Sequence, residues 1–239
     1  MSTPLSEGLA VRTSRRAFFK RAGFGLGAVA AASTLQACDS NDPIDRGADV
    51  TLDFSNDFGV LNYAYALEQL EAAFYDAAIS DSTFGSTFSS DERSVLDDLA
   101  AHEAIHRDFL RAAIVMAGGE SAVIGALTPN FDAVDFSSRT AVLQTSLALE
   151  DTGVGAYNGA GRYIEDDGYL LLAGKIVSVE ARHASVIAGI LEDNAIAGDG
   201  TIDGNALDLA LTPNQVVGPN GRATPFIADS ITLVNVPSS

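Results

Sequence analysis

The sequence predicts an all-α protein: a four-helix bundle with one long crossover connection and an irregular C-terminal tail. Four long stretches carry apolar residues at helical spacing. The connections between them are short, long and short, and a long middle connection can cross from one end of a bundle to the other. Each stretch also places an acidic residue on an otherwise apolar face, which ordinary core packing does not require.

The N-terminal segment of the sequence has the form of a targeting signal. Residues 14–20, SRRAFFK, match a twin-arginine export signal, and the apolar stretch 22–32 is shorter than the roughly 20 residues of a membrane-spanning helix. Residues 35–38, LQAC, resemble a bacterial lipobox, in which the cysteine becomes lipidated. We therefore expect residues 1–37 to be an export signal and Cys38 to carry a lipid, although an ordinary cleavage site followed by a stray thiol is the alternative.

Residues 38–55, rich in Asp, Gly and Pro, then read as a tether between the lipid and the domain. This arrangement predicts a protein exported by the twin-arginine route and anchored on the periplasmic side of the cell envelope. Cys38 is the single cysteine, so an internal disulfide cannot form.

The charge of the chain is strongly acidic, with 14 basic and 32 acidic residues. Residues 1–37 hold five of the basic residues and one of the acidic ones, so the remainder has 9 basic against 31 acidic residues. A surface of this charge repels phosphate backbones, and we expect no nucleic acid among the partners.

The first two helices have clear boundaries. We expect the first over residues 57–79, capped by Asn56 or Asp57, and a loop over residues 80–89. Residues 89–92, SSDE, form a capping box, so the second helix begins there and continues to about residue 117. Gly118 and Gly119 end it.

The third and fourth helices follow the long connection. We expect the third over residues 137–164, a tight break at residues 166–168, DDG, and the fourth over residues 169–195. These helices complete a bundle over residues 56–197, and residues 198–239 form an irregular C-terminal extension packed on it. Four glycines in the third helix weaken it, and we expect them to allow close packing against a neighbouring helix: Gly153, Gly155, Gly159 and Gly161.

The acidic residues on the apolar faces follow a pattern. Two helices carry Glu-x-x-His, and the other two carry a Glu without a following His. A Glu and a His three residues apart lie on one helix face and can reach the same point in a bundle interior. The predicted metal ligands are Glu68, Glu103, His106, Glu150, Glu180 and His183.

Burial of these carboxylates needs compensation. An isolated ionised carboxylate in an apolar core costs several kcal/mol. Two divalent cations would supply the positive charge, and four Glu with two His is the ligand set of two-metal carboxylate sites in four-helix bundles. Glu and His suit iron or manganese, so we expect two iron ions, with two manganese ions as the alternative.

Further residues near this set could bind metal or contact its ligands. Glu71 lies one turn after Glu68 and is the alternative ligand on the first helix, and His102 lies one turn before His106. Tyr75 follows Glu68 by seven residues, as Tyr157 follows Glu150, which indicates a repeated helical hairpin. The tyrosines could hydrogen-bond the carboxylates, donate an electron or simply pack.

The segments LNYAYALEQLEAAFY, 61–75, and LEDTGVGAY, 149–157, resemble a ferritin-like domain family of bacterial secreted proteins. That family is related to desiccation-associated proteins and, more distantly, to bacterioferritin and rubrerythrin. The resemblance covers about residues 56–197 and implies the bundle fold and the metal ligands. The Glu-to-Tyr spacing, shared with bacterioferritin, favours Glu68 over Glu71.

Three functions remain open from the sequence. The first is a di-iron oxidoreductase that oxidises ferrous iron or consumes peroxide or oxygen, with its ions bridged by Glu150 and one other Glu. The second is a di-manganese catalase-like enzyme. The third is a non-enzymatic protein that protects the envelope against desiccation or stress. A tether and a long tail hinder a closed storage shell, so we expect a monomer or a dimer.

Overall fold

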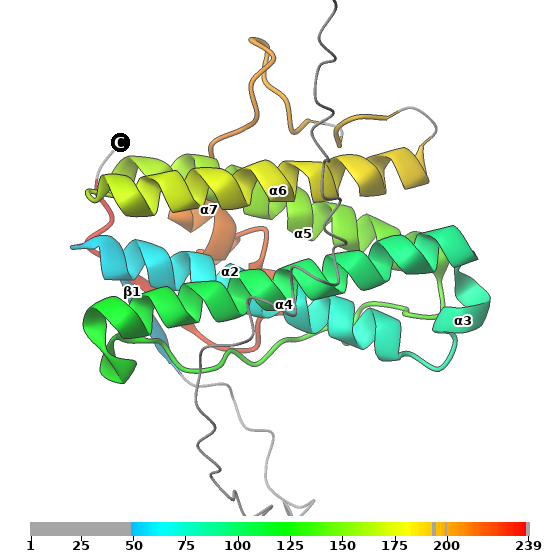
Figure 1. Ribbon diagram of the computed structural model, residues 1–239, viewed down its shortest axis with the longest axis horizontal. Helices are drawn as coiled ribbons and strands as arrows, with labels where there is room; N and C mark the ends of the chain where they lie inside the picture. Colours follow the sequence, from blue (N-terminus) through cyan, green and yellow to red (C-terminus); the bar gives the residue numbers. More distant parts are fainter. Residues whose placement is uncertain (1–48, 193–194, 199, 238–239) are drawn as a thin grey trace, which may run out of the picture. The chain divides into compact units, whose positions relative to one another are not determined.

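The computed structural model describes residues 49–192, 195–198 and 200–237. The predicted export signal, Cys38 and all but the end of the predicted tether lie outside these ranges. Four long helices dominate the described part: α2 (Asp57–Ser80), α4 (Ser90–Gly118), α5 (Arg139–Ala160) and α6 (Asp167–Leu191). They form the predicted bundle, seen from the side in Figure 1. None of the described helices is long and apolar enough to cross a membrane.

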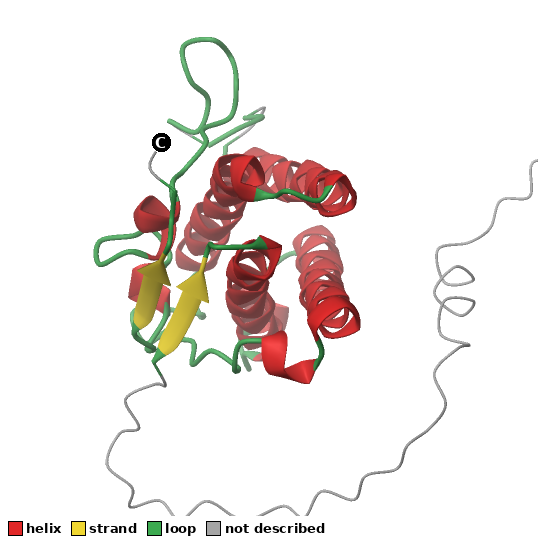
Figure 2. Ribbon diagram, turned by 90° about the vertical axis from the view of Figure 1, so that its left-hand side faces the viewer, coloured by secondary structure: helices red, strands yellow, loops and turns green. Residues whose placement is uncertain are grey.

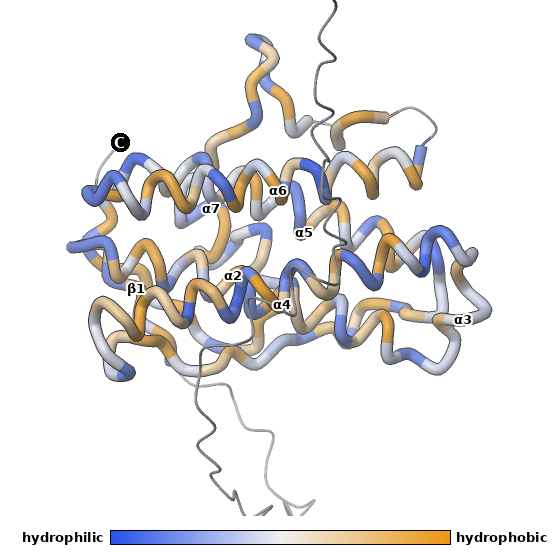
Figure 3. Tube along the Cα trace, in the orientation of Figure 1, coloured by the Kyte–Doolittle hydropathy of each residue, from blue (hydrophilic) through white to orange (hydrophobic). Residues whose placement is uncertain are grey.

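The helices form two hairpins. α2 packs mainly against α4, and α5 packs mainly against α6, whereas α4 and α6 meet over few residues. Figure 2 shows the four helices nearly end-on. Polar and apolar residues alternate around each of them (Figure 3), so the apolar sides can face the interior while the polar sides meet water.

Local signals set most helix ends. The side chain of Asn56 accepts a hydrogen bond from the amide of Phe58 and caps α2, and Ser89 forms the predicted capping box with Glu92. Gly119, with φ of 80°, follows the last residue of α4. The loop predicted over residues 80–89 contains a four-residue helix, α3 (Phe84–Thr87).

The boundaries of α5 and α6 differ from the prediction. The α-helical part of α5 ends at Ala160, where the amide of Gly161 donates the last helical hydrogen bond to the carbonyl of Tyr157. Residues Gly161–Tyr163 then form one 3₁₀ turn. α6 begins two residues earlier than expected, since the side chain of Asp166 accepts from the amides of Gly168 and Tyr169. α6 ends at Leu191, before the predicted residue 195.

The long connection between α4 and α5 is fixed to α2 by two amide side chains. Asn62 donates to the carbonyl of Ala122 and accepts from the amide of Ile124. Gln69, seven residues on, accepts from the amide of Leu127 at 3.0 Å. This connection also contains a 3₁₀ turn, Glu120–Ala122. The long connection that the sequence predicts between the second and third helices therefore follows one side of α2.

The C-terminal extension contains more regular structure than expected. It includes α7 (Pro213–Val217), a 3₁₀ turn at Thr224–Phe226 and the strand β2 (Ile231–Val234). β2 pairs in parallel with β1 (Val50–Asp53), a segment at the end of the predicted tether. Figure 2 shows both strands on one side of the bundle. Leu52 of β1 is fully buried, so this part of the expected tether belongs to the folded domain.

Two of the glycines of α5 serve a different contact from the one predicted. A Cβ at Gly159 would lie 1.7 Å from the backbone oxygen of Leu211, and the amide of Leu211 donates to the carbonyl of Gly155 at 2.8 Å. These two glycines thus admit an extended segment of the C-terminal extension. Gly153 does face a helix, because its missing Cβ leaves room for the carboxylate of Glu71 on α2.

Candidate metal centre

The four long helices bring all six predicted ligands together in the bundle interior. Each helix is buried along the face that holds its Glu, and the four carboxylates have no exposed surface. His183 is buried as well, and 13% of the His106 side chain is exposed. α2 supplies Glu68, α4 supplies Glu103 and His106, α5 supplies Glu150, and α6 supplies Glu180 and His183.

The ligand atoms form two overlapping sets. In each set, one oxygen or nitrogen atom per residue lies within 4.8 Å of every other. The first set, which we call position A, consists of Glu68, Glu103, His106 and Glu180. The second set, position B, consists of Glu103, Glu150, Glu180 and His183.

Both histidines direct Nδ1 at the carboxylates. At position A, Nδ1 of His106 lies 2.8 Å from Glu180, 3.3 Å from Glu103 and 3.5 Å from Glu68. At position B, Nδ1 of His183 lies 2.7 Å from Glu103 and 3.4 Å from both Glu150 and Glu180. Each imidazole therefore faces three carboxylates from three different helices.

Glu103 and Glu180 belong to both positions, whereas Glu68 and Glu150 belong to one each. The bridging role that the sequence assigned to Glu150 does not fit this geometry. The two shared residues are the Glu of the two Glu-x-x-His motifs. A carboxylate has two oxygen atoms, so one residue between two positions can offer one oxygen to each.

The two tyrosines hydrogen-bond the carboxylates that are not shared. Tyr157 on α5 donates to Glu68 on α2, and Tyr75 on α2 donates to Glu150 on α5, each at 2.5 Å. Burial, together with the adjacent carboxylate charge, raises the pKa of both hydroxyls well above 10. The tyrosines therefore remain protonated and act as hydrogen-bond donors.

Ser146, a residue not predicted from the sequence, extends this contact. Its hydroxyl lies 2.5 Å from that of Tyr75, and it is fully buried. Ser146 stands one turn before Glu150 on the same helix, and that spacing on an apolar face was the signal that could have identified it.

Glu71 lies outside both positions. It is buried and faces the space left by Gly153, where a Cβ would come within 2.9 Å of its Oε1. Burial and the nearby charges of Glu68 and Glu180 raise its pKa well above 4.5. The geometry thus favours Glu68 over Glu71 as the α2 ligand, as the tyrosine spacing predicts.

His102 contacts a ligand rather than the carboxylate set. Its Nδ1 lies 2.9 Å from Nε2 of His183, the ring nitrogen opposite the one that faces the carboxylates. A metal-binding histidine commonly hydrogen-bonds through its other nitrogen, which fixes the ring orientation. Of the two roles that the sequence left open for His102, this position is that of an orienting group.

Burial dominates the electrostatics of the carboxylates. It raises the pKa of Glu68 and Glu150 well above 4.5, and the neighbouring carboxylates Glu180 and Glu103 add to this shift. Burial acts in the same direction on Glu103, but the close contacts with His106 and His183 outweigh it and lower the pKa to about 2. Burial therefore favours proton uptake by Glu68 and Glu150 unless positive charge is bound beside them.

The histidines carry the compensating protons. Burial disfavours their charged forms, but the three facing carboxylates outweigh it and raise the pKa of both His106 and His183 to about 12. In the metal-free protein both imidazoles are therefore cationic at neutral pH. Each protonated histidine contributes one positive charge to the centre, whereas a divalent cation bound in its place would contribute two.

The donor atoms of the centre fit bound metal. Within the described residues, buried oxygen atoms of Glu68, Glu103, Glu150 and Glu180 and Nδ1 of His183 lie at ion-pair distance from one another but make no hydrogen bond of good geometry. Buried polar atoms rarely lack a hydrogen-bond partner, so a bound metal cation is a suitable partner for these atoms. One imidazole and three carboxylates at each position are ligands that iron and manganese accept.

Comparison with known proteins agrees with this architecture. The family model described as "Ferritin-like domain" matches residues 56–193, which is more than half of the chain. A search of curated proteins finds no match. The matched range starts at the cap of α2 and includes all of α6, so it contains every residue of positions A and B.

Proposed function

Since the chain belongs to the family of ferritin-like domains, we propose that it binds two transition-metal ions at positions A and B and acts as an oxidoreductase. Iron is the preferred metal and manganese the alternative. The substrate would be ferrous iron itself, or dioxygen or peroxide that the bound ions reduce. The sharing of Glu103 and Glu180 between the two ligand sets carries this proposal, because a site for one ion needs no second set.

The chemistry follows from having two ions side by side. Two ferrous ions held by these residues would supply one electron each, and these two electrons with two protons would reduce dioxygen to hydrogen peroxide, or peroxide to two molecules of water. Residues around the centre orient the side chains that would bind the ions. Tyr157 and Tyr75 orient Glu68 and Glu150, and His102 orients His183.

The protein environment also restricts what reaches the centre. All four ligand carboxylates are fully buried, so bulk water does not bathe them. His106, with its small exposed fraction on the α4 side, is the ligand nearest to solvent. Small reactants therefore fit this centre better than extended organic substrates.

We further propose that the protein works at the cell envelope, where a lipid on Cys38 tethers it to the membrane. The twin-arginine motif and the lipobox support export and anchoring. The excess of acidic residues supports a role with cations and against nucleic acid. A monomer or dimer suits a tethered domain better than a closed shell.

Metal analysis of the full chain, expressed with iron and manganese both available, tests the proposal. We expect two ions of iron or manganese per chain, and their loss from a variant that carries Glu103→Ala together with Glu180→Ala. Circular dichroism of the same samples controls for folding. A helical protein without bound transition metal would contradict the proposed activity and favour the non-enzymatic protective role.

A further inference from the structure

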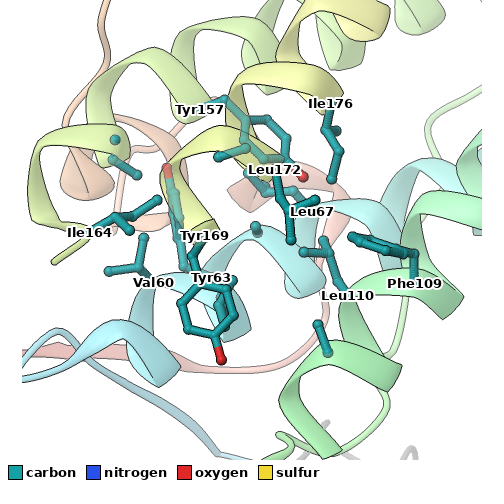
Figure 4. A pocket seen from close by; sticks show the side chains of 16 residues that line it. Val60, Tyr63, Leu67, Phe109, Leu110, Tyr157, Ile164, Tyr169, Leu172 and Ile176 are labelled. Atoms are coloured by element: carbon teal, nitrogen blue, oxygen red, sulfur yellow. The ribbon is translucent and has the colours of Figure 1, made fainter. Parts of the chain in front are cut away.

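A cavity lies in the bundle next to the metal centre, lined by apolar and aromatic residues from all four long helices (Figure 4). Its volume is about 20 Å³, which leaves room for one small molecule. Its walls include Ala64 and Leu67 of α2, Leu110 and Ala113 of α4, Tyr157 of α5 and Ile176 of α6. No charged side chain is among its lining residues.

The cavity occupies the layer of the bundle adjacent to position A. Ala64 precedes Glu68 by one turn of α2, Leu110 follows His106 by one turn of α4, and Ile176 precedes Glu180 by one turn of α6. Tyr157 forms part of the wall, and its hydroxyl donates to Glu68. A molecule in the cavity is therefore separated from a ligand of position A by a single side chain.

The walls of the cavity suit an apolar occupant. A buried water needs about two to four polar partners, and an apolar cavity without them stays dry and takes up xenon or small hydrocarbons. The hydroxyl of Tyr157 is engaged with Glu68. Tyr63 and Tyr169 also line the cavity, but almost all of its surface is apolar, which falls short of what a buried water requires.

The lining also reaches the surface between α4 and α6. Phe109 belongs to it and is 42% exposed, and Ala113 and Leu172 are half-buried. α4 and α6 meet over few residues, so the two hairpins are joined less extensively along this seam than the helices within each hairpin. A small molecule can thus enter from the side without passing the buried carboxylates first.

We propose that this cavity is the entry site for dioxygen, the small apolar oxidant of the metal centre. This inference rests on the proposed function and narrows it, because hydrogen peroxide, a polar molecule, gains nothing from apolar walls. Dioxygen would collect in the cavity from solvent and pass Tyr157 to position A. Peroxide would reach the centre by the exposed edge of His106 instead.

Xenon binding to the metal-free full chain tests the cavity independently of any activity. Xenon is apolar and about the size of dioxygen, and methyl resonances report its contacts. We expect xenon to shift the methyl signals of Leu67, Leu110 and Ile176 in a saturable manner. Shifts confined to other methyl groups, or none, would overturn the proposal even if the protein binds two metals.

A matched pair of variants tests the route. Ala113→Leu places a larger side chain in the cavity, whereas Ala112→Leu makes the same change at the neighbouring exposed position of α4, outside the lining. We expect Ala113→Leu to abolish xenon binding and to slow oxidation of the ferrous protein by dioxygen several-fold, with its rate with peroxide unchanged. Ala112→Leu should change neither rate nor xenon binding.

Ala173→Leu, from the opposite wall on α6, provides a second obstruction if the first variant folds poorly. Equal rates with dioxygen in the two Leu variants of α4, or equal slowing with both oxidants, would contradict the route. Absence of bound metal would instead contradict the proposed function, and the xenon measurement would then still decide whether the cavity takes up an apolar gas.

Discussion

Tyr157 donates its hydroxyl hydrogen to Glu68, a residue 89 positions earlier and on the other hairpin of the bundle. Tyr75 makes the corresponding contact in reverse, from the α2 hairpin to Glu150. Each donating tyrosine lies seven residues after the Glu of its own helix, which is the spacing that the sequence repeats. Each hairpin therefore supplies one unshared carboxylate ligand and the tyrosine that orients the unshared carboxylate of the other hairpin.

Replacing Tyr157 by Phe should destabilise the metal-free protein. The change leaves a fully buried carboxylate oxygen of Glu68 without its donor, and such a loss costs about 1–3 kcal/mol. Chemical denaturation measures the free energy of unfolding. Tyr65→Phe is the matched control, since Tyr65 is buried on α2 but its hydroxyl makes no hydrogen bond within the described structure, and we expect a near-neutral effect. Equal losses in both variants would indicate general packing rather than the contact with Glu68.

Substitution of single carboxylates should distinguish shared from unshared ligands. Glu103→Gln alters both positions and should abolish binding of both ions, whereas Glu68→Gln alters position A alone and should leave one ion per chain. Metal analysis after gel filtration measures the stoichiometry. Glu71→Gln is the control, because it makes the same change one turn from Glu68 on α2 but outside both sets, and two ions should remain. Loss of metal from Glu71→Gln would show that position A extends to that residue.

Metal loading should release protons and strengthen as pH rises. The raised pKa values of His106 and His183, about 12, mean that both imidazoles hold an extra proton at neutral pH in the metal-free protein. Metal and proton compete for Nδ1, so higher pH favours the metal. Titration calorimetry in buffers that differ in ionisation enthalpy measures the number of protons released. A binding enthalpy that does not depend on the buffer would be incompatible with cationic histidines.

Gly159→Ala should weaken the attachment of the C-terminal extension to α5. The new methyl group would meet the backbone oxygen of Leu211, which cannot move aside as a side chain does, and overpacking of this kind costs about 1–3 kcal/mol. Gly174→Ala on α6 is the control, because nothing lies within 4 Å of the added carbon. We expect this control to gain about 0.5–1 kcal/mol from better helix propensity. Thermal unfolding of both variants checks the opposite signs.

The long helices could be predicted from the sequence because their signals are local. Apolar spacing identified all four, and the capping box at Ser89 fixed the start of α4. The pairing of Val50–Asp53 with Ile231–Val234 has no such local signal. Each strand is only four residues long and is formed by pairing with a segment far away in the chain. The contact of Gly155 and Gly159 was wrongly predicted for the same reason, because their partner, Leu211, lies in a segment without periodicity.

The site residues could be predicted, whereas their arrangement could not. Six chemically suitable residues stood out on apolar faces, and the structure brings all six together. Which carboxylates lie between the two positions depends on how the helices are shifted and rotated relative to one another. Sequence spacing within one helix does not contain that information, so Glu150 was given the role that Glu180 and Glu103 fit.

The parallel pairing of β1 with β2 determines when the domain can be completed. During synthesis from the amino terminus, β1 emerges before every helix of the bundle, and its partner Ile231–Val234 emerges after all of them. Until then the hydrogen-bonding edge of β1 stays open, and an open edge can pair with a strand of another chain. A chain that stops short of residue 231 would therefore retain all the ligand residues but would leave the edge of β1 unpaired. Such a truncated chain should aggregate rather than lose the metal centre.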